Sequence, residues 1–146
     1  MINDLQKHLK TTLQEKMGTK ARCEVFPDIP TGYKPKHAKC DVLIHYPGST
    51  YKEVTAGFGL MERSPVIEFR VVTRGYSGES GAIAMLEEVI AAMWNYQPVV
   101  ANLEMSVLKP LPNGDGFHSF ADGIWQYYVR FKTDVLFTGQ VSNENK

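Results

Sequence analysis

Two segments of the chain repeat apolar residues at the spacing that places them on one face of an α-helix. The first predicts a helix over about residues 3–17, which Gly18 can end; its apolar stripe comprises Ile2, Leu5, Leu9 and Leu13. The second predicts a helix over residues 79–96, which Pro98 ends; its apolar face comprises Ile83, Leu86, Val89, Ile90 and Met93.

Five other segments predict β-strands. All but the second alternate apolar and polar residues, which is the spacing of a strand with one buried face. They predict strands over residues 21–25, 40–46, 67–71, 103–107 and about 125–135. The last is the longest, and its apolar face comprises Trp125, Tyr127, Val129, Phe131 and Val135. We expect the first four of these to line the core beneath the second helix, because both elements present matching apolar faces.

Proline and glycine residues predict where the strands end. Prolines open a loop over residues 27–38, and Pro47-Gly48 predicts the end of the second strand. Turn residues dominate the segment 110–119, which we expect to be a loop. The segment 49–64 fits neither period, because glycines interrupt its apolar residues, and it predicts either a long hairpin arm or a mobile loop.

The order of elements is therefore α-β-β-β-α-β-β, with mostly short connections. This order predicts an α+β fold in which two helices pack on one face of a mostly antiparallel or mixed sheet of about five strands. The length of 146 residues is that of one domain. We place this single domain at residues 1–138 and a polar C-terminal tail at residues 139–146.

Composition and charge narrow the class of protein. Apolar residues make up 43% and charged residues 22%, which is typical of a soluble globular domain. Sixteen basic residues balance sixteen acidic ones, whereas a nucleic-acid-binding domain usually carries a basic excess. No apolar run approaches the ~20 residues of a membrane span, and the N-terminus has no apolar signal core. We expect no membrane contact and a cytosolic place of synthesis.

The reactive side chains form no recognisable constellation. The candidate metal ligands are Cys23, His37, Cys40 and His45, of which only His37 and Cys40 lie at close spacing. We expect no metal and no cofactor, and we interpret both cysteines as small apolar residues. Ser49 lies outside the nucleophile-elbow motif of hydrolases. A protein that is not an enzyme is therefore the expectation, with a small hydrolase or ligand-binding domain as the alternative.

Several short stretches together resemble a family of small tail-terminator-like proteins of Mu-like, contractile-tailed phages and prophages. They are Val25-Phe26-Pro27, Val42 to Ser49 with Tyr51, Phe69-Arg70-Val71 with Arg74, Gly81-Ala82 before Leu86, Val89 and Ala92, and Gly123-Ile124-Trp125-Gln126-Tyr127 before Val129 and Phe131. The last stretch is the most specific. Together they follow one another along nearly the whole chain.

The resemblance implies a phage tail terminator without catalytic residues or cofactor. Such a protein forms a homo-hexameric ring at the tail end, or neck, of the virion. The ring caps the tail tube protein, contacts the head connector and, in contractile tails, the tail sheath protein. DNA passes through the lumen without specific binding, and assembly takes place in the host bacterial cytoplasm. A head–tail joining protein or another tail structural protein is the closest alternative.

The segment 51–63 is the candidate assembly interface. It is too long for a tight turn and carries more apolar residues than a disordered linker. The residues we assign to the interface are Tyr51, Val54, Phe58, Leu60 and Met61. The alternative is that these side chains fold back on their own domain.

Overall fold

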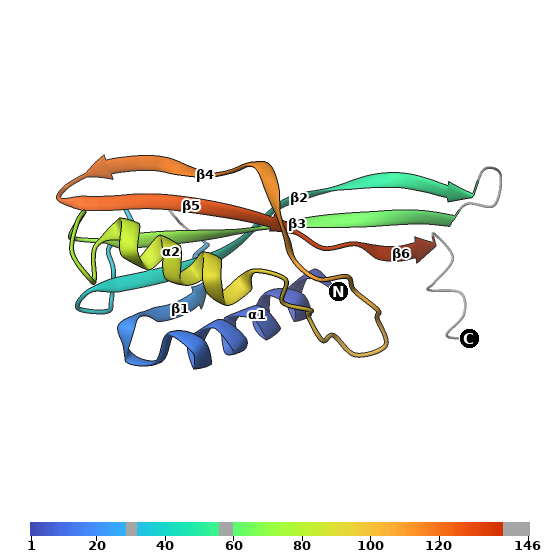
Figure 1. The fold of residues 1–146 in the computed structure, drawn as a ribbon, viewed down its shortest axis with the longest axis horizontal. Helices are drawn as coiled ribbons and strands as arrows, with labels where there is room; N and C mark the ends of the chain where they lie inside the picture. Colours follow the sequence, from blue (N-terminus) through green and yellow to red (C-terminus); the bar gives the residue numbers. More distant parts are fainter. Residues whose placement is uncertain (29–31, 56–59, 139–146) are drawn as a thin grey trace.

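The computed structural model describes residues 1–28, 32–55 and 60–138, and in it two helices cover one face of a six-stranded mixed sheet (Figure 1). This confirms the predicted α+β fold, with one strand more than expected. The elements in chain order are α1 (Ile2–Met17), the 3₁₀ turn η1 (Gly18–Lys20), β1 (Arg22–Val25), β2 (Cys40–Thr55), β3 (Leu60–Thr73), α2 (Ala82–Met93), β4 (Lys109–Ala121), β5 (Ile124–Lys132) and β6 (Val135–Thr138).

The sheet has the strand order β1-β2-β3-β5-β4, and β6 pairs with β3 beyond the end of β5. Among the described strand pairs, β1 and β2 run parallel and the others are antiparallel. β3 is thus the central strand along its whole length, since β5 and then β6 follow one another along one side of it. The two strands β2 and β3 extend together past the helices (Figure 1).

The helices bury their apolar faces on the sheet. In α1 the buried residues follow the predicted stripe and are Leu5, Leu9, Leu13 and Met17, and the helix ends at Gly18 with a φ of 60°. α2 is shorter than predicted. It begins after Gly81, where a Cβ atom would lie 2.5 Å from the carbonyl oxygen of Ser77, so that no larger residue fits this turn. Its buried residues are Ala82, Met85, Leu86, Val89 and Met93, so Ile83 and Ile90 lie at the margin of the predicted face.

The core beneath α2 contains only part of the predicted strand face. Val129 and Phe131 are fully enclosed, and the Phe131 ring meets Phe69 edge to face with 6.0 Å between ring centroids. Trp125 and Tyr127 are only half-buried, because β5 runs past the N-terminal end of α2. Of the four residues expected in the core, Val129 and Phe131 are buried there, Tyr127 packs against its margin, and Trp125 lies outside it.

Three predictions about strands and loops are wrong. Pro47-Gly48 does not end β2, because a bulge between His45 and Gly48 absorbs the proline and pairing with β3 resumes. The segment 103–107 contains only isolated bridges. The segment 110–119 lies within β4, which as the outermost strand tolerates proline at positions whose N–H would otherwise face solvent.

Among the described residues, neither helix combines the length and the apolar character that crossing a bilayer requires.

Candidate functional site

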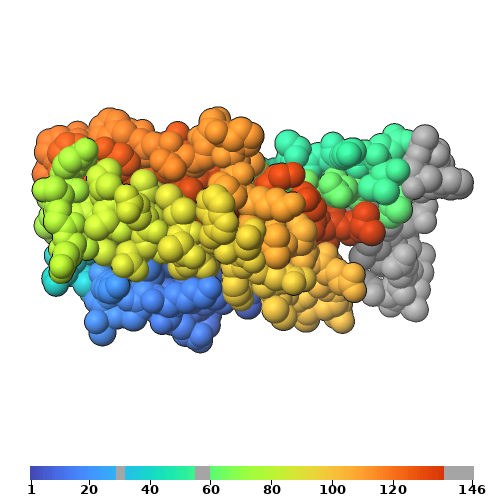
Figure 2. All heavy atoms as spheres, in the orientation of Figure 1, coloured from blue at the N-terminus to red at the C-terminus, as the bar shows by residue number. Residues whose placement is uncertain are grey.

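The outer parts of β2 and β3 form an arm that extends beyond the helices (Figures 1 and 2). We define the arm as residues 48–55 of β2 and 60–66 of β3. These segments pair from Gly48 with Val66 to Thr55 with Leu60, with one bulge on β2 between Glu53 and Thr55. β6 pairs with the β3 side of the arm. Within the described residues no strand pairs with the other side, because β1 reaches only as far as Ile44 along β2. The hairpin alternative for the segment 49–64 is thus the one observed in its described residues.

A hydrogen-bond network fixes the base of the arm. Arg63 donates from Nε to Ser49 Oγ at 3.1 Å and from Nη2 to the Tyr46 hydroxyl at 3.0 Å. The Tyr46 and Ser49 hydroxyl oxygens lie 2.6 Å apart. Burial opposes ionisation of Tyr46, but the bonds to Ser49 and Arg63 outweigh it and lower the pKa of the phenol. The network joins the two strands on both sides of the bulge, so it holds the arm in line with the sheet.

The arm presents apolar side chains on both faces. Tyr51 is 52% exposed and Val54 is 48% exposed, whereas Leu60 and Met61 are half-buried. Phe58, the fifth residue of the predicted interface, lies outside the described residues. Tyr51 and Val54 do not fold back into the core of their own domain. Whether these residues form an assembly interface remains a prediction.

A second apolar surface lies where β4 turns into β5. We call it the aromatic patch; its members are Tyr76, Phe117, Phe120, Trp125 and Tyr127. The shortest contact joins the rings of Phe120 and Trp125, whose centroids are 4.3 Å apart. Phe117 and Phe120 remain 54% and 51% exposed, respectively. A domain rarely leaves so many adjacent rings exposed unless another molecule covers them.

No pattern in the sequence predicts this patch. Phe117 and Phe120 are three residues apart and would point to opposite faces of a regular strand. A bulge at His118 adds one residue to β4, because Phe117 pairs with Tyr127 while Ser119 pairs with Gln126. The extra residue returns Phe120 to the same face of the sheet as Phe117. Both phenylalanines therefore lie on the helix-bearing face of the sheet.

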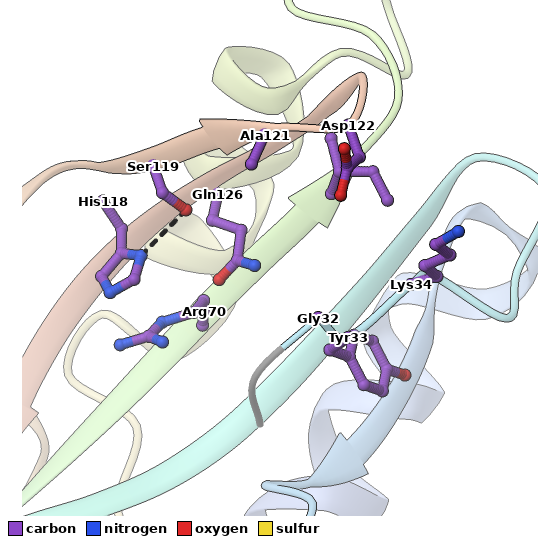
Figure 3. Close-up of a pocket in the computed structure, with 10 residues that line it drawn as sticks. Gly32, Tyr33, Lys34, Arg70, His118, Ser119, Ala121, Asp122 and Gln126 are labelled. Carbon is purple, nitrogen blue, oxygen red and sulfur yellow. Dashed lines mark hydrogen bonds between the residues drawn. The ribbon is translucent and has the colours of Figure 1, made fainter. Parts of the chain in front are cut away.

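The opposite face of the sheet carries a polar cleft of about 370 Å³ (Figure 3). Its lining includes Tyr33, Lys34, Arg70, His118 and Gln126. The bulge directs His118 to this face, where its Nδ1 lies 3.1 Å from Ser119 Oγ. Burial and the nearby Arg70 guanidinium both lower the pKa of His118. Among the described residues no carboxylate hydrogen-bonds to His118, so the serine and histidine lack the third group that orients a catalytic base.

A buried carboxylate lies next to this cleft. Glu68 is 1% exposed and accepts hydrogen bonds from Arg70 Nη2 at 2.7 Å and Arg130 Nε at 2.9 Å. His45 Nδ1 lies 3.5 Å from it. Burial opposes ionisation, but the two guanidinium groups outweigh it and the pKa of Glu68 lies below its ordinary value. The cluster links three strands on the sheet face opposite the two described helices.

The candidate metal ligands are not brought together. Within the described residues no group of three His, Cys, Asp or Glu side chains is placed to hold a metal ion. Cys23 and Cys40 are buried free thiols, and burial raises the pKa of both, that of Cys23 to about 12. His37 donates from Nε2 to the Thr19 carbonyl at 2.9 Å and accepts the Lys39 amide at Nδ1. The two cysteines and His37 are therefore held by contacts within the fold.

A family model described as Gp37 protein matches residues 10–146. The chain belongs to the Gp37 protein family. No curated protein matches this family member by sequence. Among solved structures, a chain from the virion of a native gene transfer agent particle is similar, with a TM-score of 0.60, 13% identity, and coverage of 93% of this chain and 97% of that chain. A second solved chain, whose name states no function, matches with a TM-score of 0.56, 13% identity and 93% coverage of each chain. At these identities the likeness shows the shared fold alone.

Proposed function

We propose that this Gp37 family member is a virion structural protein that acts as a tail terminator. It forms a homo-hexameric ring that caps the tail tube and contacts the head connector and, in contractile tails, the sheath. The observation that carries the proposal is the fold shared with a gene transfer agent virion chain over nearly the full length of both chains. The stretches that resemble the Mu-like tail proteins support it further, as does the arm, which leaves Tyr51 and Val54 exposed.

The proposed mechanism depends on the shape of the ring and not on catalysis. A contact between two different surfaces of neighbouring copies gives a ring when the rotation between the copies closes. One face of such a ring matches the growing end of the tube, and the opposite face does not, so growth stops. The arm extends away from the helices and can reach a neighbouring subunit or the tube. The balanced charge of the chain suits a lumen that lets DNA pass without holding it.

A head–tail joining protein at the neck is the nearest rival, because it differs only in position within the virion. A small hydrolase or ligand-binding domain is a rival of another class. The polar cleft with Arg70, His118 and Gln126 is the observation that favours it. The terminator proposal assigns no catalysis to this cleft.

Negative-stain imaging of the purified chain, alone and after mixing with tail tubes, tests the proposal. We expect rings of uniform size, and tubes that carry one ring at one end and no longer elongate. Rings that bind tubes without halting growth would favour a joining protein instead. A chain that stays monomeric at high concentration and leaves tubes uncapped would contradict both neck roles.

A further inference from the structure

The arm and the aromatic patch lie toward opposite ends of the long axis of the molecule (Figure 1). The arm continues β2 and β3 beyond the helices, and Phe117, Phe120 and Trp125 lie near the turn between β4 and β5 at the other end. Both surfaces expose apolar side chains that the domain itself does not cover. Two such surfaces at opposite ends are the requirement for a repeating head-to-tail contact.

Each surface also borders an unpaired strand edge. β4 is the last strand of the sheet order, and in the arm β2 has β3 on one side and no described strand on the other. The N–H and C=O groups along such edges can pair with an added strand. Prolines and a register shift between Pro110 and Asp115 limit the first half of β4. The stretch Gly116–Ala121 contains no proline, and all of its residues except the bulged His118 pair with β5.

On both strand edges the aromatic side chains lie on the helix-bearing face of the sheet. Tyr51 lies opposite Arg63, which is on the same face of β3 as the core residue Phe69. Phe117 lies opposite Tyr127, which also belongs to the helix-bearing face. An arrangement that keeps the helix-bearing faces on one side therefore places Tyr51 of one copy against the aromatic patch of the next.

We propose that the arm of one copy adds as a strand to the Gly116–Ala121 edge of β4 in the next copy, with Tyr51 packed on the aromatic patch. This inference deepens the proposed function, on which it rests, by naming the acceptor surface for the arm. The partner at this edge is a second copy of the chain, because every copy carries one arm and one aromatic patch. A closed ring then covers every arm and every patch. Pairing of arm with arm would form a dimer and leave both patches uncovered.

A cross-linking experiment between two single variants tests the contact. Lys52→Cys in the arm and Ala121→Cys at the end of β4 replace exposed residues, and the two native thiols are buried. A short bis-maleimide reagent is added to each variant alone and to their mixture. We expect a covalent dimer only in the mixture, at least tenfold above the level in either variant alone. Wild type measures the background.

Imaging of the same samples separates this inference from the proposed function. Rings without the mixed product would overturn the inference and leave the ring proposal standing, with the tail tube as the remaining occupant of the arm. The mixed product without closed rings would support the contact and overturn the ring. If neither rings nor the mixed cross-linked product formed, both the inference and the ring proposal would be overturned.

A complementation experiment guards against variants that simply misfold. Tyr51→Ser removes the arm anchor, and Phe117→Ser removes part of the patch. We expect each variant to be a folded monomer, with its thermal unfolding within a few degrees of wild type. Mixing them should restore one contact per pair, between the intact arm of Phe117→Ser and the intact patch of Tyr51→Ser, and give dimers without rings. A mixture that stays monomeric would contradict the head-to-tail contact, and Val99→Ser, at another exposed apolar residue, is the control that should still assemble.

Discussion

Arg70 donates from Nη2 to Oε2 of Glu68 at 2.7 Å, and the two residues are neighbours on the same face of β3. The Arg70 guanidinium also lies over the ring of Phe26, 5.1 Å from its centroid. On the next strand, Arg130 binds the other Glu68 oxygen while lying over Tyr128. On the sheet face opposite the helices, the buried carboxylate of Glu68 thus lies between two cations whose flat surfaces rest on aromatic rings.

Glu68→Gln should destabilise the fold by about 2–3 kcal/mol, because it leaves two neighbouring guanidinium groups without their counter-charge. The figure lies below that for a fully buried pair because Arg130 is partly exposed to solvent. Urea unfolding followed by circular dichroism measures the change. Glu79→Gln, at an exposed glutamate, is the matched control and should shift the midpoint little. Equal effects of the two substitutions would refute the role of the cluster.

The contribution of Glu68 should depend on pH in a defined direction. Its pKa is lowered below the ordinary value of 4.5, so the folded state favours the charged form. The stability gained is complete above that ordinary value and is lost as the pH falls through the lower pKa of the folded protein. The difference between wild type and Glu68→Gln in urea unfolding should therefore be constant around neutral pH and shrink below pH 4.5. A difference that grows in acid would contradict the assigned sign.

Phe131→Ala should lower the free energy of unfolding by about 3–5 kcal/mol, as expected for a fully enclosed aromatic residue. Phe131 is enclosed in the core against Phe69. Trp125→Ala is the comparison on the same strand face, and it should cost less because Trp125 is only half-buried. Thermal and urea unfolding of both variants gives the order, and the reverse order would show that the core lies elsewhere along β5.

Cys23 and Cys40 should not react with thiol reagents in the folded protein. Burial shields both and raises their pKa values, so that almost no thiolate forms at mildly alkaline pH. A colorimetric thiol assay should register no rapid reaction in buffer and two thiols per chain after unfolding in urea. The double serine variant should still assemble, and elemental analysis of wild type should find no stoichiometric zinc. Fast labelling of the native protein, or bound zinc, would assign these residues a function.

Val54→Asp should reduce ring assembly by at least tenfold while leaving thermal unfolding nearly unchanged. The side chain is exposed in the free subunit, so a carboxylate costs little there, but an apolar contact would have to desolvate it. Val99→Asp, at an exposed valine outside the arm, is the control. Light scattering coupled to size exclusion measures the assembly. Rings that form equally well in both variants would remove Val54 from the interface.

The fold class could be predicted from the sequence because the strongest repeats of apolar residues lie within single helices and strands. The stripe of α1 matches its buried residues, and the alternation in β3 and β5 identified both segments as strands. The bounds of β2 and β4 could not be predicted, because proline and glycine signal a turn in isolation but are tolerated at a bulge or on an outer edge. Whether Pro47 lies in a turn or a bulge depends on a partner strand that a local pattern does not reveal.

The candidate surfaces were predictable only in part. Tyr51 and Val54 stood out because an apolar segment without a regular period is unusual, and both are exposed. The aromatic patch was not predicted, because its members come from three segments and because the bulge at His118 reverses the side-chain parity. The Glu68 cluster was not predicted for a similar reason, since its side chains come from three strands and no local pattern indicates that Arg70 and Arg130 meet the same carboxylate.

β3 runs from the tip of the described arm to the loop before α2 without a bulge of its own, since both irregularities in its pairing with β2 fall on β2. It therefore connects the arm to the body of the domain as one uninterrupted strand. Tension applied along the arm acts parallel to this strand and loads the hydrogen bonds to its neighbours in shear, many at once. In the proposed assembly, a subunit held by its arm should resist being pulled along the strand far more than being peeled sideways.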